Sequence, residues 1–505
     1  MVNGAIVTMS LSSPEKEVIL PVQLYRAEQV RAMDRQAIEI VGIPGLILME
    51  RAGKAAWELL QKKWPGAINI AVFCGPGNNG GDGYVVARLA KEAGLTVHLY
   101  SSTESSRLKG DAATVCQLWL DAGGGLEKPL SPNKKNFDLV VDGLLGTGLD
   151  RLVDGEMATV INEINSMDVP VLALDIASGL HSDKGASLGT SVDAEATISF
   201  IGLKQGLFTG EGVALSGEVY YDSLDVPESV LTSQQSESKR FTADGTCLPK
   251  REKTAHKGLF GHVLVAGGER GFSGAVQMAA SAALRAGAGL VSLATRSEHA
   301  ALLNLVRPEL MVHGIDKRVD LAPLLKKSSV AAVGPGLGQT VWAQNLLAEL
   351  LDTAMPLVVD ADALNLLAKE PFKRDNWVLT PHPGEAARLL GITIKEIESD
   401  RFSSVKALQK KYGGVVVLKG AGTLIFDGSE MVINTTGNPG MASGGMGDVL
   451  SGVIAALLAQ GLSLSQSARF GVWLHGKAGD IAAKEGERGL LASDLLRPLR
   501  VLVNQ

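Results

Sequence analysis

Asp448 stands between a glycine-rich loop and an apolar segment, in the stretch NTTGNPGMASGGMGDVLSGVIAALLAQG of residues 434–461. A glycine loop that runs into a helix presents unpaired backbone N–H groups and the positive end of the helix dipole, which together bind phosphate. A carboxylate in that place repels phosphate, so it needs another task. Removal of a proton from a hydroxyl that is about to be phosphorylated fits. An acid that only stabilises the dipole would explain Asp448, but not the five glycines and two threonines before it.

Three further clusters of polar residues follow apolar runs in the first half of the chain. They are NNGGDG at 78–83, DGLLGTG at 142–148 and DIASG at 175–179. Each cluster alone is ordinary turn chemistry. Because the carboxyl ends of parallel strands lie at one edge of a sheet, we expect the three clusters to converge there. The side-chain oxygens of Asn79, Asp142 and Ser178 would then suit a hard monovalent or divalent cation, and the loop N–H groups of 78–82 a phosphate.

The elements that must position these residues alternate along the first half. Helical spacing of apolar residues predicts two helices over 23–60, separated by GIPG. A short apolar run at 68–73 predicts a strand that ends at the glycine loop, and later strand candidates are VHLY, DLVVDGL, VPVLALDI and ATISFIG. This alternation predicts a doubly wound parallel sheet. The glycine loop has neither the GxGxxG dinucleotide pattern nor the GxxxxGKS/T phosphate pattern.

A polar segment divides the chain. Residues 227–254 lose apolar periodicity and form the predicted domain boundary. The second half restarts with the strand-like HVLVAGG and a small-residue helix over 273–286, and repeated strand-to-loop transitions predict a second layered α/β domain. Near the end, His475 is expected to be a structural histidine. The predicted organisation is a tail at 1–22, a first domain at 23–226, a linker at 227–254 and a second domain at 255–505.

Composition narrows the function classes. The chain has 505 residues, of which 46% are apolar and 20% charged, as in globular proteins of two or three domains. A net charge of −6 without a basic run argues against nucleic acid as a partner. The three cysteines, Cys74, Cys116 and Cys247, are scattered and form no CxxC pair. This pattern favours the reducing cytoplasm and argues against disulfide bonds and a structural zinc site. Neither a membrane span nor a secretion signal is expected.

Taken together, the motifs resemble a known family. GPGNNGGDG, VDGLLGTG and LDIASG are similar to the epimerase domain of the NAD(P)H-hydrate repair enzymes. KGLFGHVLVAGG, GPGLG, DADALN, TPHPGE, KGAGT and NTTGNPGMASGGMGDVLSG are similar to their dehydratase domain. The resemblance extends from Gln23 to the C-terminus except for the linker, in the order of the bifunctional bacterial proteins. It implies an N-terminal Rossmann-like three-layer α/β/α domain and a C-terminal ribokinase-like α/β domain.

The resemblance also implies a function. The substrates would be NADH and NADPH hydrated on the nicotinamide ring, NADHX and NADPHX, which exist as R and S epimers. The first domain would interconvert the epimers with potassium bound. The second would dehydrate the S form with ADP as co-substrate, releasing AMP and phosphate, with Mg²⁺ at its site. Phosphorylation before elimination is sensible chemistry, because hydroxide is a poor leaving group and a phosphate ester is a better one. An assembly of identical chains is expected, with the apolar segment 46–60 as a candidate interface.

The resemblance also implies a role for individual residues in each shared motif. Potassium would be bound by Asn79, Asp142 and Ser178. The hydrate in the first domain would be contacted by Asn78, Asn79, Gly80, Gly81, Asp82, Gly146, Thr147, Gly148, Leu149, Asp150, Arg151, Leu152 and Asp175. In the second domain the hydrate would be contacted by Ala275, Gly336, His382 and Asp448, and ADP by Lys419, Gly420, Ala421, Gly422, Thr423 and Gly447. Asp448 would be the catalytic base, and Asp175 either a proton shuttle for epimerisation or a hydrogen-bond acceptor that positions the ligand.

One motif departs from related kinases, and two other functions compete. Sugar kinases of the ribokinase-like fold carry Asn-x-x-Glu where this chain has His382-Pro383-Gly384-Glu385. Glu385 could still organise a magnesium-bound water and His382 could touch substrate, while proline and glutamate also favour a helix start. The competing functions are a hydroxyl kinase for a vitamin precursor such as a thiazole or pyrimidine alcohol, and a non-catalytic dimerising or scaffold module. The first leaves the N-terminal cluster unexplained, and the second has no need of a polar pocket.

Overall fold

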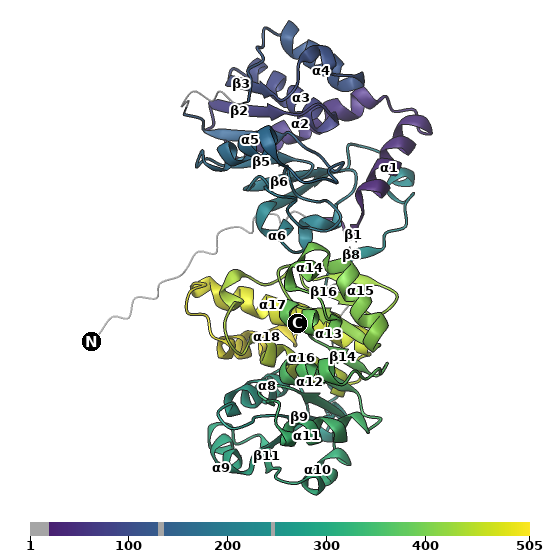
Figure 1. Ribbon diagram of the computed structural model, residues 1–505, viewed down its shortest axis with the longest axis vertical. Helices are drawn as coiled ribbons and strands as arrows, with labels where there is room; N and C mark the ends of the chain where they lie inside the picture. The colour runs from purple at the N-terminus through teal and green to yellow at the C-terminus, as the bar shows by residue number, and fades with distance from the viewer. Residues whose placement is uncertain (1–19, 130–135, 244–247) are drawn as a thin grey trace, which may run out of the picture.

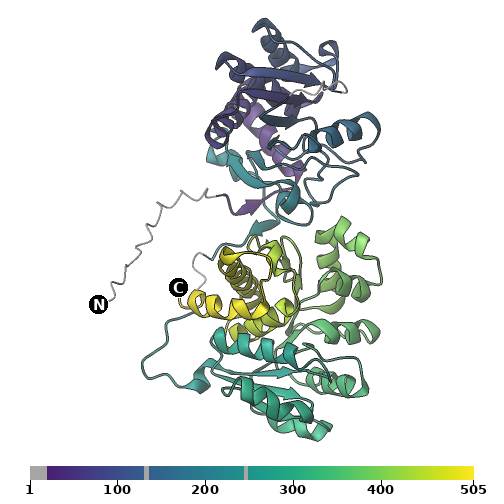
Figure 2. The same ribbon diagram turned by 90° about the vertical axis from the view of Figure 1, so that its left-hand side faces the viewer.

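Two β-sheets, each covered by helices, organise the chain in the computed structural model, which describes residues 20–129, 136–243 and 248–505. The two α/β bodies lie one beyond the other along the long axis of the molecule (Figure 1). The view turned by 90° shows the same arrangement (Figure 2). The predicted α/β class is confirmed. The predicted tail lies outside the described residues except for its last three.

The first sheet has six parallel strands in the order β3-β2-β4-β5-β6-β7. Their bounds are β2 Asn69–Cys74, β3 Thr96–Ser101, β4 Leu139–Gly143, β5 Val171–Leu174, β6 Ala196–Phe200 and β7 Glu218–Asp222. The accompanying helices are α1 Ala27–Glu39, α2 Gly45–Lys63, α3 Asn78–Glu92, η1 Ser105–Arg107, α4 Gly110–Asp121, α5 Gly155–Asn165, η2 Gln205–Phe208, α6 Gly212–Leu215 and α7 Glu228–Leu231. The chain leaves β2 toward β3 on one side and returns to β4 on the other, so a crevice forms between the carboxyl ends of β2 and β4.

The second sheet is larger, with the order β1-β8-β17-β16-β15-β14-β13-β12-β9-β10-β11. Its strands are β1 Gln23–Leu24, β8 Ser238–Arg240, β9 His262–Ala266, β10 Leu290–Thr295, β11 Met311–Gly314, β12 Val330–Val333, β13 Leu357–Val359, β14 Trp377–Leu379, β15 Val415–Leu418, β16 Leu424–Phe426 and β17 Met431–Ile433. Along the sheet, neighbouring strands are parallel from β11 through β10, β9, β12, β13 and β14 to β15. Runs such as VAAV and VVVL are buried throughout, as expected for parallel strands covered on both faces.

Helices cover both faces of the second sheet. They are η3 Lys257–Phe260, α8 Ser273–Arg285, α9 Ser297–Val306, α10 Arg318–Leu325, α11 Val341–Leu351, α12 Ala361–Lys369, α13 Pro383–Leu390, α14 Ile394–Ser399, α15 Arg401–Tyr412, η4 Pro439–Met441, α16 Met446–Ala459, α17 Leu464–Ala482, η5 Ala483–Glu485, η6 Ala492–Leu495 and α18 Leu496–Leu502. The apolar α16 is buried on nearly all sides. It packs so closely on α8 that a Cβ on Gly452 would lie only 1.9 Å from the Ala279 carbonyl oxygen.

The predicted linker at 227–254 is not a plain connection. It contains α7 and β8, and β8 pairs in parallel with β17 of the second sheet. The chain start contributes as well, because β1 pairs antiparallel with β8. The sequence did not predict β8 because its composition is polar. The strand pairs through backbone groups, and only Ser238 of its three residues is buried. Residues 244–247 of the predicted linker lie outside the described residues.

Two further expectations concern the molecular surface. Within the described ranges, no helix combines the length and the apolar composition needed to cross a lipid bilayer. The apolar face of α2, a candidate interface, packs inside the first domain through buried residues such as Ala52 and Ala56, and α2 contacts α3 extensively. Association of identical chains and a cytoplasmic location stay predictions.

Candidate active sites

The first candidate site is a cavity of about 550 Å³ at the crevice between β2 and β4. Its lining includes most of the residues predicted to contact the hydrate, namely Asn78, Asn79, Asp82, Gly146, Thr147, Gly148, Leu149, Asp150, Arg151 and Asp175. Three predicted residues do not line it. Gly80 and Gly81 are buried within α3, and Leu152 is 69% exposed. The volume is in the range of sites for small molecules and cofactors.

The predicted phosphate loop at 78–82 is wrong in its local structure. These residues form the first turn of α3, which is capped by Gly77. The free amides are therefore those of a helix N-terminus rather than of an open loop. The glycines are needed because the backbone turns tightly: a Cβ on Gly75 would lie 1.8 Å from the Leu144 carbonyl oxygen, and one on Gly80 would lie 2.0 Å from the Gly75 carbonyl oxygen.

The predicted cation ligands meet in one hydrogen-bond network around Leu145. Ser178 donates from Oγ to Asp142 Oδ1 at 2.6 Å and from its backbone N–H to Asp142 Oδ2 at 2.8 Å. Asn79 Nδ2 donates to the Leu145 carbonyl at 3.0 Å, and the Leu145 N–H donates to Ser178 Oγ at 2.8 Å. Asp142 and Ser178 are fully buried. Burial raises the pKa of Asp142 to about 6, although hydrogen bonds from Ser178 oppose the rise.

One acceptor in this network has no partner. Asn79 Oδ1 is buried and receives no hydrogen bond from the described residues. A buried amide oxygen without a donor is costly. Together with the carboxylate of Asp142 and the hydroxyl of Ser178, it forms an oxygen-only donor set of the kind that hard cations prefer. The residues present therefore fit a cation.

Asp175 occupies a strained position at the end of β5. Its φ angle is +63°, in the left-handed region that non-glycine residues rarely adopt and that often marks a functional site. Its carboxylate accepts a hydrogen bond from the Phe200 N–H at 3.3 Å and forms a close ion pair with Lys204. The Lys204 side chain is fully buried and also donates to Ser199 Oγ at 3.0 Å. The ion pair fixes the Asp175 carboxylate at the cavity, where it can accept a hydrogen bond from a ligand.

Asp82 and Asp34, two of the other carboxyl groups that line the same cavity, have raised pKa values. Burial raises the pKa of Asp82 well above its ordinary value, and the nearby charges of Asp175 and Asp34 raise it further. Burial also raises the pKa of Asp34 to about 6, and Lys204 partly opposes this rise. Carboxyl groups whose environments differ in this way can divide the roles of proton donor and proton acceptor. The cavity can therefore supply both partners of a proton transfer.

Sequence reasoning missed Lys204 and Asp34. A signal for Asp34 was present, because it lies four residues after Val30 on the same face of α1 as the buried Met33 and Ala37. Lys204 gave a weaker signal, since only its place shortly after β6 suggested that it would reach the sheet edge shared with Asp175.

The second candidate site is built around the start of α16. Gly445 caps this helix with a φ angle of +91°, and Asp448 lies in the first turn, as predicted. Burial raises the pKa of Asp448 to about 7, and the charge of Asp360 adds to the rise while Lys419 opposes it. The carboxyl group is thus poised to gain and lose a proton near neutral pH, which suits a general base.

Lys419 and Asp360 form the centre of this site. Lys419 Nζ donates to Asp360 Oδ1 at 2.7 Å and lies 3.9 Å from Glu385 Oε2. Ser451 Oγ of α16 donates to Asp360 Oδ2 at 2.8 Å. A Cβ on Gly447 would lie 3.2 Å from Lys419 Nζ, so the predicted nucleotide residues Lys419 and Gly447 face each other. The roles of Asp360 and Ser451 were missed, although the DADALN motif at the end of β13 repeats the strand-end acid seen elsewhere.

The loop between β15 and β16 carries the other predicted nucleotide residues, Gly420, Ala421, Gly422 and Thr423. No described residue accepts a hydrogen bond from the backbone N–H groups of Gly420, Ala421 or Gly422. Consecutive free amides of this kind form an anion-binding concavity. The loop therefore has the free donors that a phosphate needs, and it follows Lys419 directly in the chain.

His382 begins α13, as the helix-start interpretation predicted. Its Nδ1 accepts a hydrogen bond from the Gly384 N–H at 3.0 Å, and Glu385 Oε2 accepts one from the His382 N–H at 2.8 Å. This reciprocal arrangement is a capping box with proline at the first helical position. The His382 side chain is half exposed beside Glu385, so capping leaves it free to touch a ligand. Burial raises the pKa of Glu385 to about 7.

Ala275 and Gly336, also predicted to contact the hydrate in the second domain, lie next to each other. Gly336 has a φ angle of +54°, and a Cβ there would lie 3.1 Å from the Ala275 Cβ. Glu269 binds the Gly336 carbonyl through its N–H at 2.7 Å. Asp362, whose charge contributes to the raised pKa of Asp448, accepts from the Gly338 N–H at 2.9 Å. The glycine loop that holds Gly336 is thereby joined to the surroundings of Asp448.

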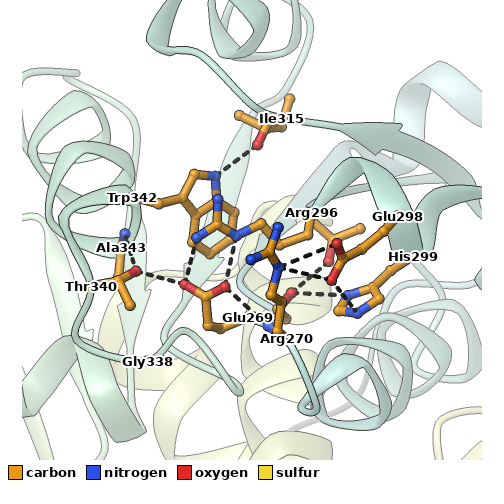
Figure 3. A network of polar contacts seen from close by, with 12 residues as sticks. Glu269, Arg270, Arg296, Glu298, His299, Ile315, Gly338, Thr340, Trp342 and Ala343 are labelled. Carbon is orange, nitrogen blue, oxygen red and sulfur yellow. Dashed lines mark hydrogen bonds and ion pairs between the residues drawn. The ribbon is translucent and has the colours of Figure 1, made fainter.

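A polar network around Glu269 and Arg296 lies next to the same glycine loop (Figure 3). Arg296 donates to both Glu269 oxygens at 2.7 and 2.8 Å, and Thr340 Oγ1 donates to Glu269 Oε2 at 2.6 Å. The Arg296 guanidinium lies 4.4 Å from the ring centre of Trp342, which in turn donates to the Ile315 carbonyl. The Arg296 hydrogen bonds hold the pKa of Glu269 well below its ordinary range. We infer that this network positions the loop.

His475 of α17 is buried, and burial lowers its pKa to about 4. It is therefore neutral at physiological pH. The expectation of a structural histidine with all its hydrogen bonds satisfied is met only in part, because its buried Nε2 has no hydrogen-bond partner among the described residues.

Comparison with known proteins gives matches to both halves of the chain. The model of the NAD(P)H-hydrate dehydratase family matches residues 263–500, and that of the YjeF-related protein N-terminus matches residues 45–206. A bifunctional NAD(P)H-hydrate repair enzyme of Coxiella burnetii is 48% identical, with 95% of this chain and 99% of the relative covered. The Escherichia coli enzyme of the same name is 45% identical, with 96% and 95% covered.

A solved structure extends the comparison to the fold. The crystal structure of a ribokinase-like superfamily protein from Enterococcus faecalis is 32% identical, with a TM-score of 0.50. The match covers 53% of this chain and 96% of that protein. The predicted ribokinase-like fold of the second domain is confirmed.

Proposed function

The chain belongs to the family of bifunctional NAD(P)H-hydrate repair enzymes, and from this premise we propose how its two sites divide the work. Residues 23–226 interconvert the R and S epimers of hydrated NADH and NADPH. Residues 255–505 dehydrate the S epimer at the expense of ADP. The observation that carries the proposal is Asp448, a half-buried carboxyl with a pKa near 7 at a helix start beside Lys419 and free loop amides.

At the second site, Asp448 takes the proton from the hydroxyl of the hydrate. The hydroxyl oxygen attacks the β-phosphorus of ADP, the bond to the bridging oxygen breaks, and AMP leaves. The carbon–oxygen bond of the phosphate ester then breaks, phosphate leaves with the electron pair, and loss of a ring proton restores the reduced nicotinamide. Lys419 and the amides of Gly420, Ala421 and Gly422 stabilise the phosphoryl oxygens, as does the start of α16.

Magnesium fits the charge balance of this site. Lys419 lies among four carboxyl groups whose charges affect one another, those of Asp360, Asp362, Glu385 and Asp448. A divalent cation would offset this excess, held by Asp360 and by Glu385 through water. When bound, it would neutralise charge on the phosphate oxygens.

At the first site, epimerisation requires the carbon–oxygen bond of the hydroxylated carbon to break and to form again on the other face of the ring. A proton given to the hydroxyl lets it leave as water, and water that adds to the opposite face gives up a proton. Asp82, whose pKa burial raises well above its ordinary value, is the donor, and Asp175, paired with Lys204, is the acceptor. Potassium would be held by Asn79, Asp142 and Ser178, where it would fix the ends of β4 and β5 and offset the charge of Asp142. A hydroxyl kinase alone would give this site no role, and a scaffold would need neither site.

The direct test gives the protein an equal mixture of both hydrate epimers with ADP and follows the absorbance of the reduced nicotinamide. Full recovery in one fast phase is expected, because the first site converts the R epimer as the second consumes the S epimer. Recovery that stops near half and is completed only at the spontaneous rate would refute the epimerase assignment. No recovery at all would refute the dehydratase assignment.

Replacement of potassium by tetramethylammonium should slow epimerisation by about tenfold or more and lower the melting temperature. The reason is that the bulky cation cannot enter the oxygen cluster, which leaves Asn79 Oδ1 unpartnered and Asp142 uncompensated. The measurement is R-epimer decay and thermal unfolding at constant ionic strength, with sodium as the size control. Identical rates and melting temperatures in all three salts would contradict the cation site.

A further inference from the structure

We propose that the two sites are energetically coupled: nucleotide bound on the loop at 419–423 tightens hydrate binding at the first site. The connection is the buried segment 204–210 of the first domain, and Arg401 and Thr209 are its positioning residues. The inference rests on the proposed function of both sites. It requires in addition that the binding of one ligand changes the affinity for the other.

The nucleotide loop packs directly against the first domain. Gly210 donates its N–H to the Ala421 carbonyl at 3.0 Å, and Thr209 Oγ1 donates to the Gly422 carbonyl at 2.8 Å. A Cβ on Gly422, whose φ angle is +60°, would lie 1.8 Å from the Phe208 carbonyl oxygen. Thr209 is fully buried. The loop therefore cannot change shape without disturbing residues 208–210.

Arg401 of α15 joins the same two segments. Its side chain is 1% exposed, and Nη2 donates to the carbonyls of Leu418 at 3.3 Å and Lys419 at 3.1 Å. Its Nε donates to Thr209 Oγ1 at 3.2 Å, so the hydroxyl accepts from Arg401 and donates to Gly422. A Cβ on Gly420 would lie 2.9 Å from the guanidinium nitrogens. One buried guanidinium thus holds the nucleotide loop and the first domain together.

The geometry of the peptide group places the two binding partners on opposite faces of the loop. In a trans peptide, the carbonyl of one residue and the N–H of the next point in opposite directions. Because the Lys419 and Ala421 carbonyls are bound by Arg401 and Gly210, the Gly420 and Gly422 N–H groups point away from these partners. A phosphate on these amides would polarise the same peptide groups and strengthen the bonds on the other side.

The other end of the segment reaches the first site. Lys204, the buried partner of Asp175, directly precedes η2, and η2 ends at Phe208 beside Thr209. The segment is held on its way, since Gln205 Nε2 donates to the Asp183 carbonyl at 2.7 Å and Gly206 donates its N–H to the Ser182 carbonyl at 2.7 Å. Ordering of residues 208–210 by a filled nucleotide loop therefore also orders Lys204 and, through it, Asp175. By linkage, both sites gain affinity by the same factor.

The test uses the full chain with the Asp448→Asn change, which prevents consumption of the hydrate. Epimerisation of NADHX is followed with and without ADP, after calorimetry has established an ADP concentration that saturates the protein. ADP is expected to lower the KM for epimerisation by about fivefold, the lower end of typical coupling. Thr209→Val in the same background should abolish the ADP effect, and Thr209→Ser, which keeps the hydroxyl, should restore it.

A second measurement separates positioning from folding. In the otherwise unchanged enzyme, Thr209→Val should raise the KM for ADP about fivefold and leave kcat within twofold. Thr197→Val is the matched control, because Thr197 is also fully buried and donates to a carbonyl, that of Ser216, within the first domain. It should lower the melting temperature to a similar extent without changing the ADP effect.

The outcomes distinguish this coupling from the proposed function. Epimerisation that is unaffected by saturating ADP would overturn the coupling and leave both activities standing. An ADP effect that survives Thr209→Val would overturn the route through Thr209. Absence of ADP binding in calorimetry, or of epimerisation under any condition, would refute the proposed function itself.

Discussion

Asp448→Asn should lower the rate of ADP-dependent dehydration by about 10²–10⁴-fold, the usual contribution of a general base, and leave epimerisation at its normal rate. Asparagine keeps the size and the hydrogen-bonding capacity of the side chain but cannot take the hydroxyl proton. The measurement is the steady-state rate with pure S epimer and ADP, beside the decay of pure R epimer without ADP. Dehydration within threefold of the normal rate would remove Asp448 from the mechanism.

The pH dependence gives an independent check on this assignment. Because the pKa of Asp448 is near 7 and the ionised form is the base, kcat should rise with pH up to about 7 and then level off. The raised pKa also affects stability, since the folded protein binds this proton more tightly than the unfolded chain does. The contribution of Asp448 to stability is thus greatest below about pH 4 and falls as the pH rises toward 7. Asp448→Asn should therefore melt at or above the normal temperature at pH 8.

Asp175→Asn should slow conversion of the R epimer by about 100-fold or more, with unchanged dehydration of the S epimer. The change removes the proton acceptor and leaves the buried Lys204 without its partner charge. Loss of one member of a buried pair typically costs about 3–5 kcal/mol. Reduced stability could therefore imitate a catalytic effect.

The double variant Asp175→Asn with Lys204→Met resolves this ambiguity. Removal of both charges should restore most of the lost melting temperature, because no unpaired charge stays buried. Epimerisation should stay slow, since the acceptor is still absent. If the single variant epimerises at the normal rate, Asp175 only positions the ligand. If the double variant recovers activity together with stability, the loss in the single variant came from folding.

Local patterns in the sequence predicted most of the elements and which strand-end residues lie close together, while the chemistry of these residues stays a prediction. Asn79, Asp142 and Ser178 converge because parallel strands end at one edge, and Asp448 lies in a first helical turn because glycine precedes an apolar helical run. His382 caps α13 as the helix-start interpretation predicted, and its contact with a ligand stays a prediction.

Contacts between distant segments were beyond prediction. Lys204 stands in the largely apolar stretch IGLKQGLF, which does not reveal its partner, and only the folded sheet places it against Asp175. Arg401 begins a helix with mixed composition, and its partners at 209 and 418–419 come from two other parts of the chain. The residues at 78–82 read as a loop because glycine disfavours helices, but close packing of Gly80 on the Gly75 carbonyl and of Gly81 on Met49 of α2 requires glycine there.

The strands β1 and β8 have a consequence for domain motion. β1 is the first element of the first domain and β8 follows that domain in the chain, yet the two strands pair with each other at the edge of the second sheet. The first domain is therefore attached to the second sheet at both of its ends, through the paired strands β1 and β8, rather than through a single connection. Such a double tether opposes the hinge rotation that is usual between domains. It also covers the edge of β17, so a dehydratase half cut out at residue 255 would expose an unpaired strand edge and tend to aggregate.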